Sequence, residues 1–187
     1  MSALSVSGTE GLISACISLY LFRNKKGTPI VIGCKVIVYF LMFAKNIVMK
    51  ILILNGPNLN LIGRREPKIY GNQSFNEFFE LMKKDFFEHD LYYYQSNHEG
   101  DLIDKLQESM GKYDGVVFNP GGYAHTSIAL ADTIRAIELP VVEVHISNIY
   151  EREEYRRHSY TAEAAKYSVV GKGLAGYDEA VKYLIGR

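Results

Sequence analysis

Short apolar runs alternate along the chain with longer segments in which apolar residues recur every three or four positions. Short runs between turn residues are typical of buried strands, and the longer pattern is typical of amphipathic helices. The sequence predicts strands at 51–54, 91–95, 115–118, 140–145 and 168–170. It predicts helices beginning after Ser74 and at 100–110, 128–137 and 177–185. We therefore expect an α/β fold: a flavodoxin-like, doubly wound, five-stranded parallel sheet with helices on both faces.

The first predicted helix has a clear start signal. Ser74 and Glu77 have the spacing of a capping box, in which each side chain accepts a hydrogen bond from the other residue's backbone N–H. The apolar side chains that follow at helical spacing predict a buried stripe made of Phe75, Phe78, Phe79, Met82 and Phe86. The second helix carries a similar set on one side, which consists of Leu102, Ile103, Leu106 and Met110, with Gly111 at its end.

The segment 55–71 is rich in Gly, Pro and Asn, which predicts a loop after the first strand. In doubly wound sheets, ligands bind beyond the carboxyl ends of the strands. We therefore expect polar side chains from this loop and from the ends of the third and fourth strands to converge in a catalytic site. These side chains are Arg65, Tyr70, Asn119, His125 and His145. Taken alone, the segment could equally be an ordinary surface loop.

The first 48 residues differ in composition from the rest of the chain. They hold both cysteines and five basic residues against one acid, whereas all five histidines follow Met49. We interpret residues 1–48 as an extension of uncertain origin outside the fold and residues 49–187 as the catalytic domain. The alternative is a membrane anchor, but its first apolar run is short and Lys35 and Lys45 interrupt the second, so membrane association is not expected.

Charge and composition narrow the classes of function. The chain is 48% hydrophobic and 22% charged, as is ordinary for a globular protein. From Met49 onward it holds 16 of the 21 basic and 20 of the 21 acidic residues, so this part is mildly acidic. A mildly acidic domain argues against a nucleic-acid partner, and we expect none.

No cofactor site is predicted. The glycines at 171–176 match G-x-G-x-x-G, but the chain ends too soon afterwards for the strand and acidic ribose ligand of a dinucleotide site, so we interpret them as turn and cap residues. The loop after the first strand lacks the hydroxyls of a flavin phosphate site, and no metal motif is present. The sequence therefore indicates chemistry without a metal or an organic cofactor.

Proton transfer is the chemistry that these residue types favour. The ordinary pKa of tyrosine is about 10. A guanidinium about 4 Å away contributes on the order of 4 kcal/mol at an effective dielectric of 20, or roughly three pKa units before desolvation opposes it. Arg65 and Tyr70 could thus form a base. His145 could be the complementary acid, with Glu143 or a backbone group fixing its tautomer.

Four motifs occur in the order GPNLNLIGRREPKIYG, NPGGYAHTS, EVHISN and REEYRRHSY. Together they resemble the signature set of the type II 3-dehydroquinate dehydratases, which are enzymes of the shikimate pathway, over nearly all of residues 49–185. The resemblance implies reversible dehydration of 3-dehydroquinate to 3-dehydroshikimate by anti elimination through an enolate, without a Schiff-base lysine, a metal or an organic cofactor.

The resemblance also assigns catalytic roles. It implies that Tyr70 removes the C2 proton, that Arg65 lowers the pKa of Tyr70, and that His145 protonates the departing hydroxyl. Asn58 would help position a water that stabilises the enolate, and Glu143 would orient His145.

The remaining residues carried over by resemblance bind substrate or support the site. Those expected to bind substrate hydroxyls and the carboxylate are Asn119, His125, Ile146, Ser147 and Arg156, the Ile146 and Ser147 contributions coming from backbone amides. Asp132 and Arg152 would support the site, a role that could cross a subunit boundary. The alternative for Asp132 and Glu143 is a purely structural role.

At the level of assembly, the resemblance implies a cytoplasmic homo-oligomer, a dodecamer made of four trimers, in which the loop from Asn58 to Tyr70 serves as a lid. Two other functions remain open. One is a non-catalytic module that keeps the anion pocket, against which the complete motif set argues. The other is a membrane-associated protein anchored by residues 1–48.

Overall fold

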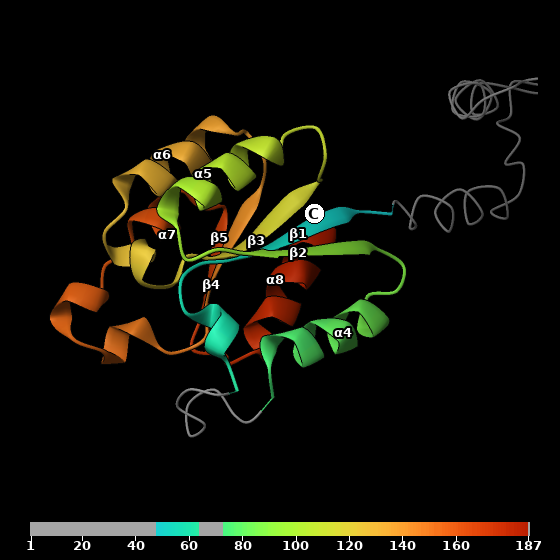
Figure 1. Ribbon diagram of the computed structural model, residues 1–187, viewed down its shortest axis with the longest axis horizontal. Helices are drawn as coiled ribbons and strands as arrows, with labels where there is room; N and C mark the ends of the chain where they lie inside the picture. Colours follow the sequence, from blue (N-terminus) through green and yellow to red (C-terminus); the bar gives the residue numbers. More distant parts are fainter. Residues whose placement is uncertain (1–47, 64–72, 187) are drawn as a thin grey trace, which may run out of the picture. The chain divides into compact units, whose positions relative to one another are not determined.

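The computed structural model of the protein describes residues 48–63 and 73–186. Its centre is a sheet of five strands in the order β2-β1-β3-β4-β5, with every neighbouring pair parallel (Figure 1). The strands are β1 (Lys50–Asn55), β2 (Asp90–Gln95), β3 (Gly115–Asn119), β4 (Val141–His145) and β5 (Tyr167–Val170). This is the flavodoxin-like strand order, so the predicted fold class is confirmed.

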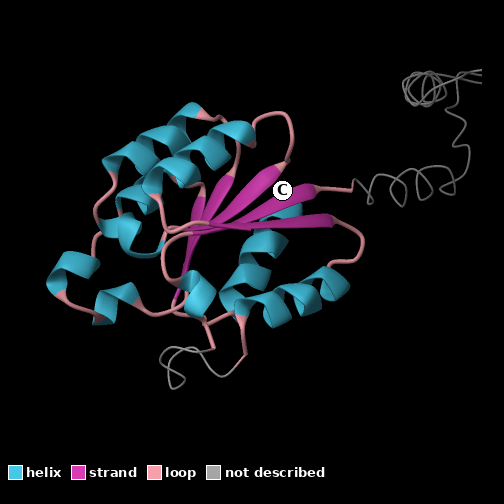
Figure 2. Ribbon diagram, viewed as in Figure 1, coloured by secondary structure: helices cyan, strands magenta, loops and turns pink. Residues whose placement is uncertain are grey.

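Helices cover both faces of the sheet (Figures 1 and 2). One face packs against α4 (Phe75–Asp85) and α8 (Ala175–Ile185), through a core that includes Ile51, Val117 and Tyr177. The other face packs against α5 (Glu99–Glu108) and α6 (Ile128–Ala136), with α7 (Tyr160–Ala164) beside α6. Because both faces are buried, β3 is apolar from Gly115 to Phe118 rather than alternating, and only its last residue, Asn119, is polar.

The predicted capping box forms at the start of α4. Ser74 Oγ accepts a hydrogen bond from the Glu77 N–H at 3.3 Å, and Glu77 Oε2 accepts one from the Ser74 N–H at 2.9 Å. That backbone amide, followed by the Ser74 hydroxyl, lowers the pKa of Glu77. The aromatic stripe is buried as predicted except for Phe86, which is half-buried at the end of the helix.

Two parts of the chain differ from the sequence prediction. Met110 lies beyond the end of α5 and is 51% exposed, so its placement on the buried side is wrong. The polar stretch 146–160 contains the 3-10 helices η3 (Ile149–Glu151) and η4 (Glu154–Arg156) and the start of α7, none of which shows an apolar period in the sequence. None of the described helices is long and apolar enough to cross a membrane.

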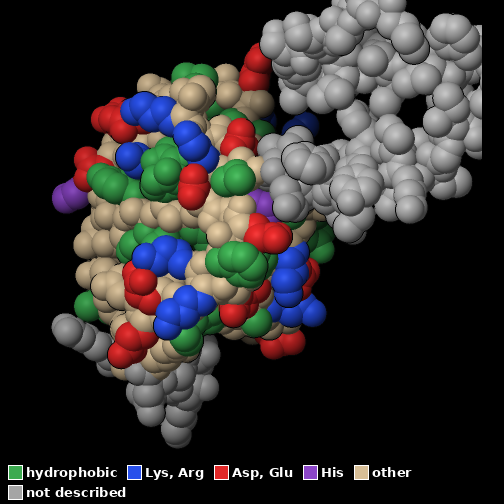
Figure 3. Space-filling model, turned by 90° about the vertical axis from the view of Figure 1, so that its right-hand side faces the viewer, with side chains coloured by type: hydrophobic (Ala, Val, Ile, Leu, Met, Phe, Trp, Pro, Cys, Tyr) green, Lys and Arg blue, Asp and Glu red, His purple; other side chains and the backbone are tan. Residues whose placement is uncertain are grey.

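Surface charges of both signs are mixed on the face shown in Figure 3, where Lys and Arg side chains lie among Asp and Glu side chains. Among the residues that the structure describes, three ion pairs on α-helix surfaces join residues three positions apart. They link Lys83 to Glu80, Lys105 to Glu108, and Arg135 to Asp132. Such exposed pairs contribute little to stability. The mixing on this face agrees with the near balance of acids and bases in the sequence.

The position of a ligand site follows from the strand order. The chain runs from β1 outward to β2 on one side and from β3 outward to β5 on the other. The connections that leave β1 and β3 therefore diverge to opposite faces, which opens a crevice beyond the carboxyl ends of these two strands.

Candidate active site

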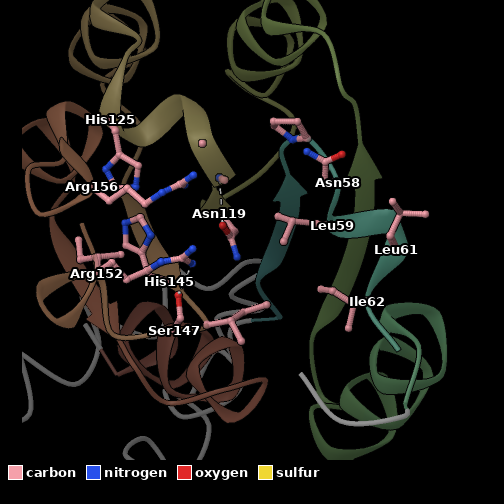
Figure 4. A pocket seen from close by; sticks show the side chains of 15 residues that line it. Asn58, Leu59, Leu61, Ile62, Asn119, His125, His145, Ser147, Arg152 and Arg156 are labelled. Carbon is pink, nitrogen blue, oxygen red and sulfur yellow. Dashed lines mark hydrogen bonds between the residues drawn. The ribbon is translucent and has the colours of Figure 1, made fainter. Parts of the chain in front are cut away.

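A pocket of about 270 Å³ lies in this crevice (Figure 4). Its walls come from the segments that follow β1, β3 and β4, so residues far apart in sequence meet there. The polar side chains that line it belong to Asn58, Asn119, His125, His145, Ser147, Arg152 and Arg156. Leu59, Leu61, Ile62 and Ile149 supply an apolar part of the wall.

The segments after β1 and β3 meet in direct backbone contact. Gly56 N–H donates to the Asn119 carbonyl at 2.7 Å, and a Cβ atom at Gly56 would lie 2.4 Å from the Pro120 carbonyl oxygen. Gly121 has φ +59, and a Cβ there would lie 3.1 Å from the Pro57 carbonyl oxygen. Pro57 and Gly121 both line the pocket, so part of its wall is backbone packed on backbone.

Asn58 begins the loop in the left-handed conformation, with φ 66 and ψ −1, which asparagine tolerates better than most residues. Its N–H donates to Asn97 Oδ1 at 2.9 Å, and the same oxygen accepts from Gln95 Nε2 at 3.1 Å. Tyr123 Oη donates to the Asn97 carbonyl at 3.0 Å. Asn97 therefore fixes the start of the loop, although nothing local in the sequence singles it out.

His145 at the end of β4 is hydrogen-bonded through Nε2 to Glu143 Oε1. The Glu143 side chain is fully buried, and its Oε1 also accepts from Ser159 Oγ at 2.8 Å. Two donors thus converge on one carboxylate oxygen, which fixes the ring of His145 at the pocket wall. Glu143 is suited to orienting His145, whereas Ser159 was not predicted because sixteen residues separate it from Glu143.

His125 is oriented by a backbone carbonyl. Its Nδ1 lies 2.7 Å from the His158 carbonyl oxygen, which only accepts, so Nδ1 carries the proton and Nε2 is an acceptor. Desolvation lowers the pKa of His125 most, the hydrogen bond with the His158 carbonyl raises it, and electrostatic interactions with His145 and Arg156 lower it while Glu143 raises it. His125 therefore offers the pocket a neutral imidazole, stacked on His145 with 6.0 Å between ring centroids.

The lowered pKa of His125 predicts a pH dependence of stability. Because the folded pKa lies below the unfolded value of about 6.5, this contribution is fully present above that pH and is lost as pH falls toward the folded pKa. We expect the urea midpoint of His125→Gln to fall less between neutral pH and pH about 5 than that of the unaltered protein. His98→Gln, at an exposed position, is the control; equal slopes for all three proteins would contradict the prediction.

The wall opposite Asn58 is suited to an anion. Arg152 Nη1 reaches Ser147 Oγ at 3.5 Å, and Glu153 lies 3.7 Å from Arg152 Nε and 3.2 Å from Arg156 Nε. The pKa of Glu153 is lowered first by its own backbone N–H and then by these two guanidinium groups. The backbone N–H groups of Ile146 and Ser147 donate to no other described residue. Two guanidinium groups and the residues Ile146 and Ser147, whose N–H groups remain available, therefore line one side of the pocket.

Gly171 and Gly173 lie in a turn, as predicted, whereas Gly176 lies within α8 and is neither a turn nor a cap residue. Gly171 and Gly173 have φ +75 and +62, and Gly171 N–H and Gly173 N–H donate to the carbonyls of His145 and Ile146, both at 3.0 Å. A Cβ at Gly171 would approach the Asn148 Cβ to 3.2 Å. The turn thus fixes the backbone at the end of β4.

Most residues predicted for the site lie together. The pocket wall includes Asn58, Asn119, His125, His145, Ile146, Ser147, Arg152 and Arg156, with Glu143 directly behind His145. Asp132 does not line it; this residue is exposed on α6 and pairs with Arg135 at 3.1 Å. Arg65 and Tyr70 lie outside the described residues. The site as described can bind a small hydroxylated anion and exchange a proton with it through a histidine.

Comparisons with known proteins show the family to which the chain belongs. Residues 49–185 match the family described as dehydroquinase class II. The 3-dehydroquinate dehydratase of Bacillus pumilus (strain SAFR-032) is 50% identical over 140 residues, which cover 72% of this chain and 92% of that protein. The enzyme of the same name from Clostridium botulinum (strain Okra / Type B1) is 50% identical over 137 residues, covering 72% and 93%.

Two solved structures that are similar to this chain are also type II dehydroquinases. A type II dehydroquinase from Butyrivibrio crossotus DSM 2876 is similar with a TM-score of 0.70 and 43% identity, over 73% of this chain and 97% of that one. The type II dehydroquinase from Propionibacterium acnes has a TM-score of 0.71 and 35% identity, over 74% and 97%. The fold and the pocket define an α/β protein with a polar site at its switch point. This chain belongs to the dehydroquinase class II family.

Proposed function

We propose that the protein catalyses the reversible dehydration of 3-dehydroquinate to 3-dehydroshikimate in the shikimate pathway. The observation that carries this proposal is the pocket itself, in which two arginines lie beside a histidine that is held by a buried carboxylate (Figure 4). The substrate carries a carboxylate, several hydroxyls and a ketone, so the donors and acceptors of this pocket match its functional groups. Family membership over residues 49–185 supports the same reaction.

The proposed reaction is an anti elimination in two proton transfers. The Tyr70 phenolate takes the C2 proton, and the electrons of the broken C–H bond move to the ketone oxygen to form an enolate. Arg65 lowers the pKa of Tyr70 so that the phenolate form is populated. A water positioned by Asn58 stabilises the enolate oxygen. The enolate then collapses to the conjugated ketone as the C–O bond at C1 breaks and the hydroxyl leaves.

His145 supplies the proton that converts the departing hydroxyl to water. Glu143 Oε1 accepts the hydrogen bond from Nε2, so the proton on this nitrogen stays in place and the imidazolium gives up its proton from Nδ1. The neutral imidazole that remains keeps its bond to Glu143. Glu143 is thus a positioning residue, and Ser159 assists it by donating to the same oxygen.

The substrate carboxylate is proposed to bind the wall that carries Arg152 and Arg156, with Arg156 and the amides of Ile146 and Ser147 donating to it and Arg152 in a supporting role. Neutral His125 accepts a hydrogen bond from a substrate hydroxyl through Nε2, and Asn119 binds a second hydroxyl. These contacts place the reacting C1–C2 bond beside His145.

Spectroscopy tests the reaction directly. When 3-dehydroquinate is added to the purified full-length chain, ultraviolet absorbance should rise as the conjugated enone forms. The same assay on protein starting at Met49 tests whether residues 1–48 are an extension outside the catalytic domain. A folded protein that gives no rise in either form would refute the proposed activity.

Replacing Arg156 by glutamine tests whether this wall binds the substrate carboxylate. We expect KM to rise by roughly 10- to 100-fold, with a smaller change in kcat, because a charged hydrogen bond to the substrate is lost in the ground state and the transition state alike. Arg157→Gln is the matched control, since Arg157 is exposed and does not line the pocket. Equal KM values for the two variants would exclude Arg156 from carboxylate binding.

The proposal extends to assembly and location. We propose a cytoplasmic dodecamer built as a tetramer of trimers, in which Asp132, exposed on α6, supports the site of a neighbouring subunit. Sedimentation equilibrium of the full chain tests the assembly. A monomer that turns over at the full rate would contradict both the oligomer and the role of Asp132.

A further inference from the structure

We propose that Tyr177 on α8 is a positioning residue that fixes the side-chain amide of Asn119 so that an N–H group, and not the carbonyl, is presented to the ligand. This role rests on the function proposed above, in which Asn119 binds a substrate hydroxyl. It concerns a residue that does not line the pocket itself.

The geometry is a chain of three hydrogen bonds at the carboxyl ends of β1 and β3. Asn55 and Asn119 are register partners at the last positions of these two strands. Tyr177 Oη lies 2.8 Å from Asn119 Nδ2 and 2.8 Å from Asn55 Oδ1, and thus bridges the two side chains. Asn55 and Tyr177 are fully buried, and Asn119 is 3% exposed.

The direction of these hydrogen bonds follows from a fixed backbone donor. Gly121 N–H, which can only donate, lies 3.1 Å from one side-chain atom of Asn119, so that atom is the carbonyl oxygen Oδ1. The other atom is therefore Nδ2, which donates to Tyr177 Oη. The phenol in turn donates its own proton to Asn55 Oδ1. A rotated Asn119 amide would place its nitrogen against the Gly121 N–H.

Tyr177 is well placed to hold this arrangement. Its ring is packed edge-on against Phe75, with 5.0 Å between centroids, and lies 6.1 Å from Phe78. Burial raises the pKa of Tyr177 well above the ordinary tyrosine range, so the phenol keeps its proton at neutral pH and donates to Asn55. The hydroxyl is therefore a fixed point rather than a titrating group.

A specific property of the pocket follows from this arrangement. An asparagine side chain has two N–H groups on Nδ2, and Tyr177 accepts from one of them. The carbonyl oxygen is engaged by Gly121. The second N–H is thus the group that Asn119 offers to the pocket, which Figure 4 shows it lining. The ligand atom that meets Asn119 must then be a hydrogen-bond acceptor.

A double-mutant cycle on kcat/KM tests the inference, with Tyr177→Phe, Asn119→Ala and the double variant compared with the unaltered full chain. Tyr177→Phe should lower kcat/KM by about fivefold to tenfold, mainly through KM, because Nδ2 then loses its hydrogen-bond partner and Gly121 alone holds the amide in its productive orientation. If Tyr177 acts through Asn119, the double variant should be no worse than Asn119→Ala alone. Effects that multiply would overturn the inference, since a general structural defect would act independently of Asn119.

Tyr167→Phe is the matched control. This change also removes a tyrosine hydroxyl bonded to a residue of α8, because Tyr167 Oη donates to Glu179 at 3.4 Å, but it does so on the surface. Its kcat/KM should equal that of the unaltered chain. If the unaltered chain turns over 3-dehydroquinate and Tyr177→Phe matches it in KM, the inference fails and the proposed function stands. If the unaltered chain does not turn over, the proposed function fails and the role of Tyr177 fails with it.

Discussion

Replacing His145 by glutamine should lower kcat by roughly 10²- to 10⁴-fold, the usual contribution of a general acid. Glutamine can still donate to Glu143 from its side-chain amide, so the buried carboxylate retains a partner and the fold is preserved. It has no proton to give to a departing hydroxyl. KM should change much less than kcat, because the carboxylate and hydroxyl contacts of the substrate lie on other residues. Steady-state kinetics with 3-dehydroquinate measure both constants.

Two further variants test whether the loss of kcat is specific to the imidazole of His145. His98→Gln changes an exposed histidine at the start of α5 and should leave kcat unaltered. Glu143→Gln should lower kcat less than His145→Gln does, because the imidazole remains but its ring and tautomer are less firmly held. If His145→Gln kept more than half of the kcat, another group would have to protonate the leaving hydroxyl.

The second large effect is expected for Tyr70→Phe, which should also lower kcat by roughly 10²- to 10⁴-fold because the proposed base is removed. The structure describes the chain up to Gly63, which directly follows the pocket residue Ile62, and again from Gln73 onward. A Cβ at Gly63 would lie 2.8 Å from Gln73 backbone atoms, so both ends of the intervening segment meet beside the pocket.

Exchange of the C2 proton separates the base from the acid. Tyr70→Phe should slow exchange of this proton with deuterated solvent as much as it slows turnover, whereas His145→Gln should slow turnover more than exchange, because the enolate still forms. Tyr92→Phe, on the outer strand β2 and 40% exposed, is the control for loss of a tyrosine hydroxyl. Rapid exchange in Tyr70→Phe would assign the base to another residue.

Much of the fold could be predicted from local patterns. The strand at Ile51–Leu54 and the helix after Ser74 are each specified by neighbouring residues, through an apolar run in one case and a capping box with its aromatic stripe in the other. Met110 was misplaced because its spacing continues the helical pattern beyond the point where α5 ends at Glu108. The turns at 149–156 were missed because 3-10 helices of three residues have no measurable period.

Some residues of the site could likewise be predicted from the sequence, and others could not. His145 and Asn119 could be predicted because strand ends meet at one edge of a parallel sheet. Glu143 and His145 are polar residues of a kind that buried strands usually lack, and both are buried in β4. Ser159 and Tyr177 could not be predicted, because each contacts the site across a long interval of sequence and serine or tyrosine is unremarkable at either position. Contacts of this kind depend on how whole helices and strands pack together, which local sequence patterns do not show.

The backbone contact between Pro57 and Gly121 has a consequence for inhibitor design. A ligand that rests on this part of the wall touches peptide atoms, which every substitution leaves in place, and Gly121 itself tolerates little change because of its φ of +59 and the 3.1 Å approach to Pro57. Resistance mutations should therefore be rare for compounds anchored there. They should arise more readily against compounds that depend on Leu59 or Leu61, whose side chains can change size without disturbing the crossing of the two segments.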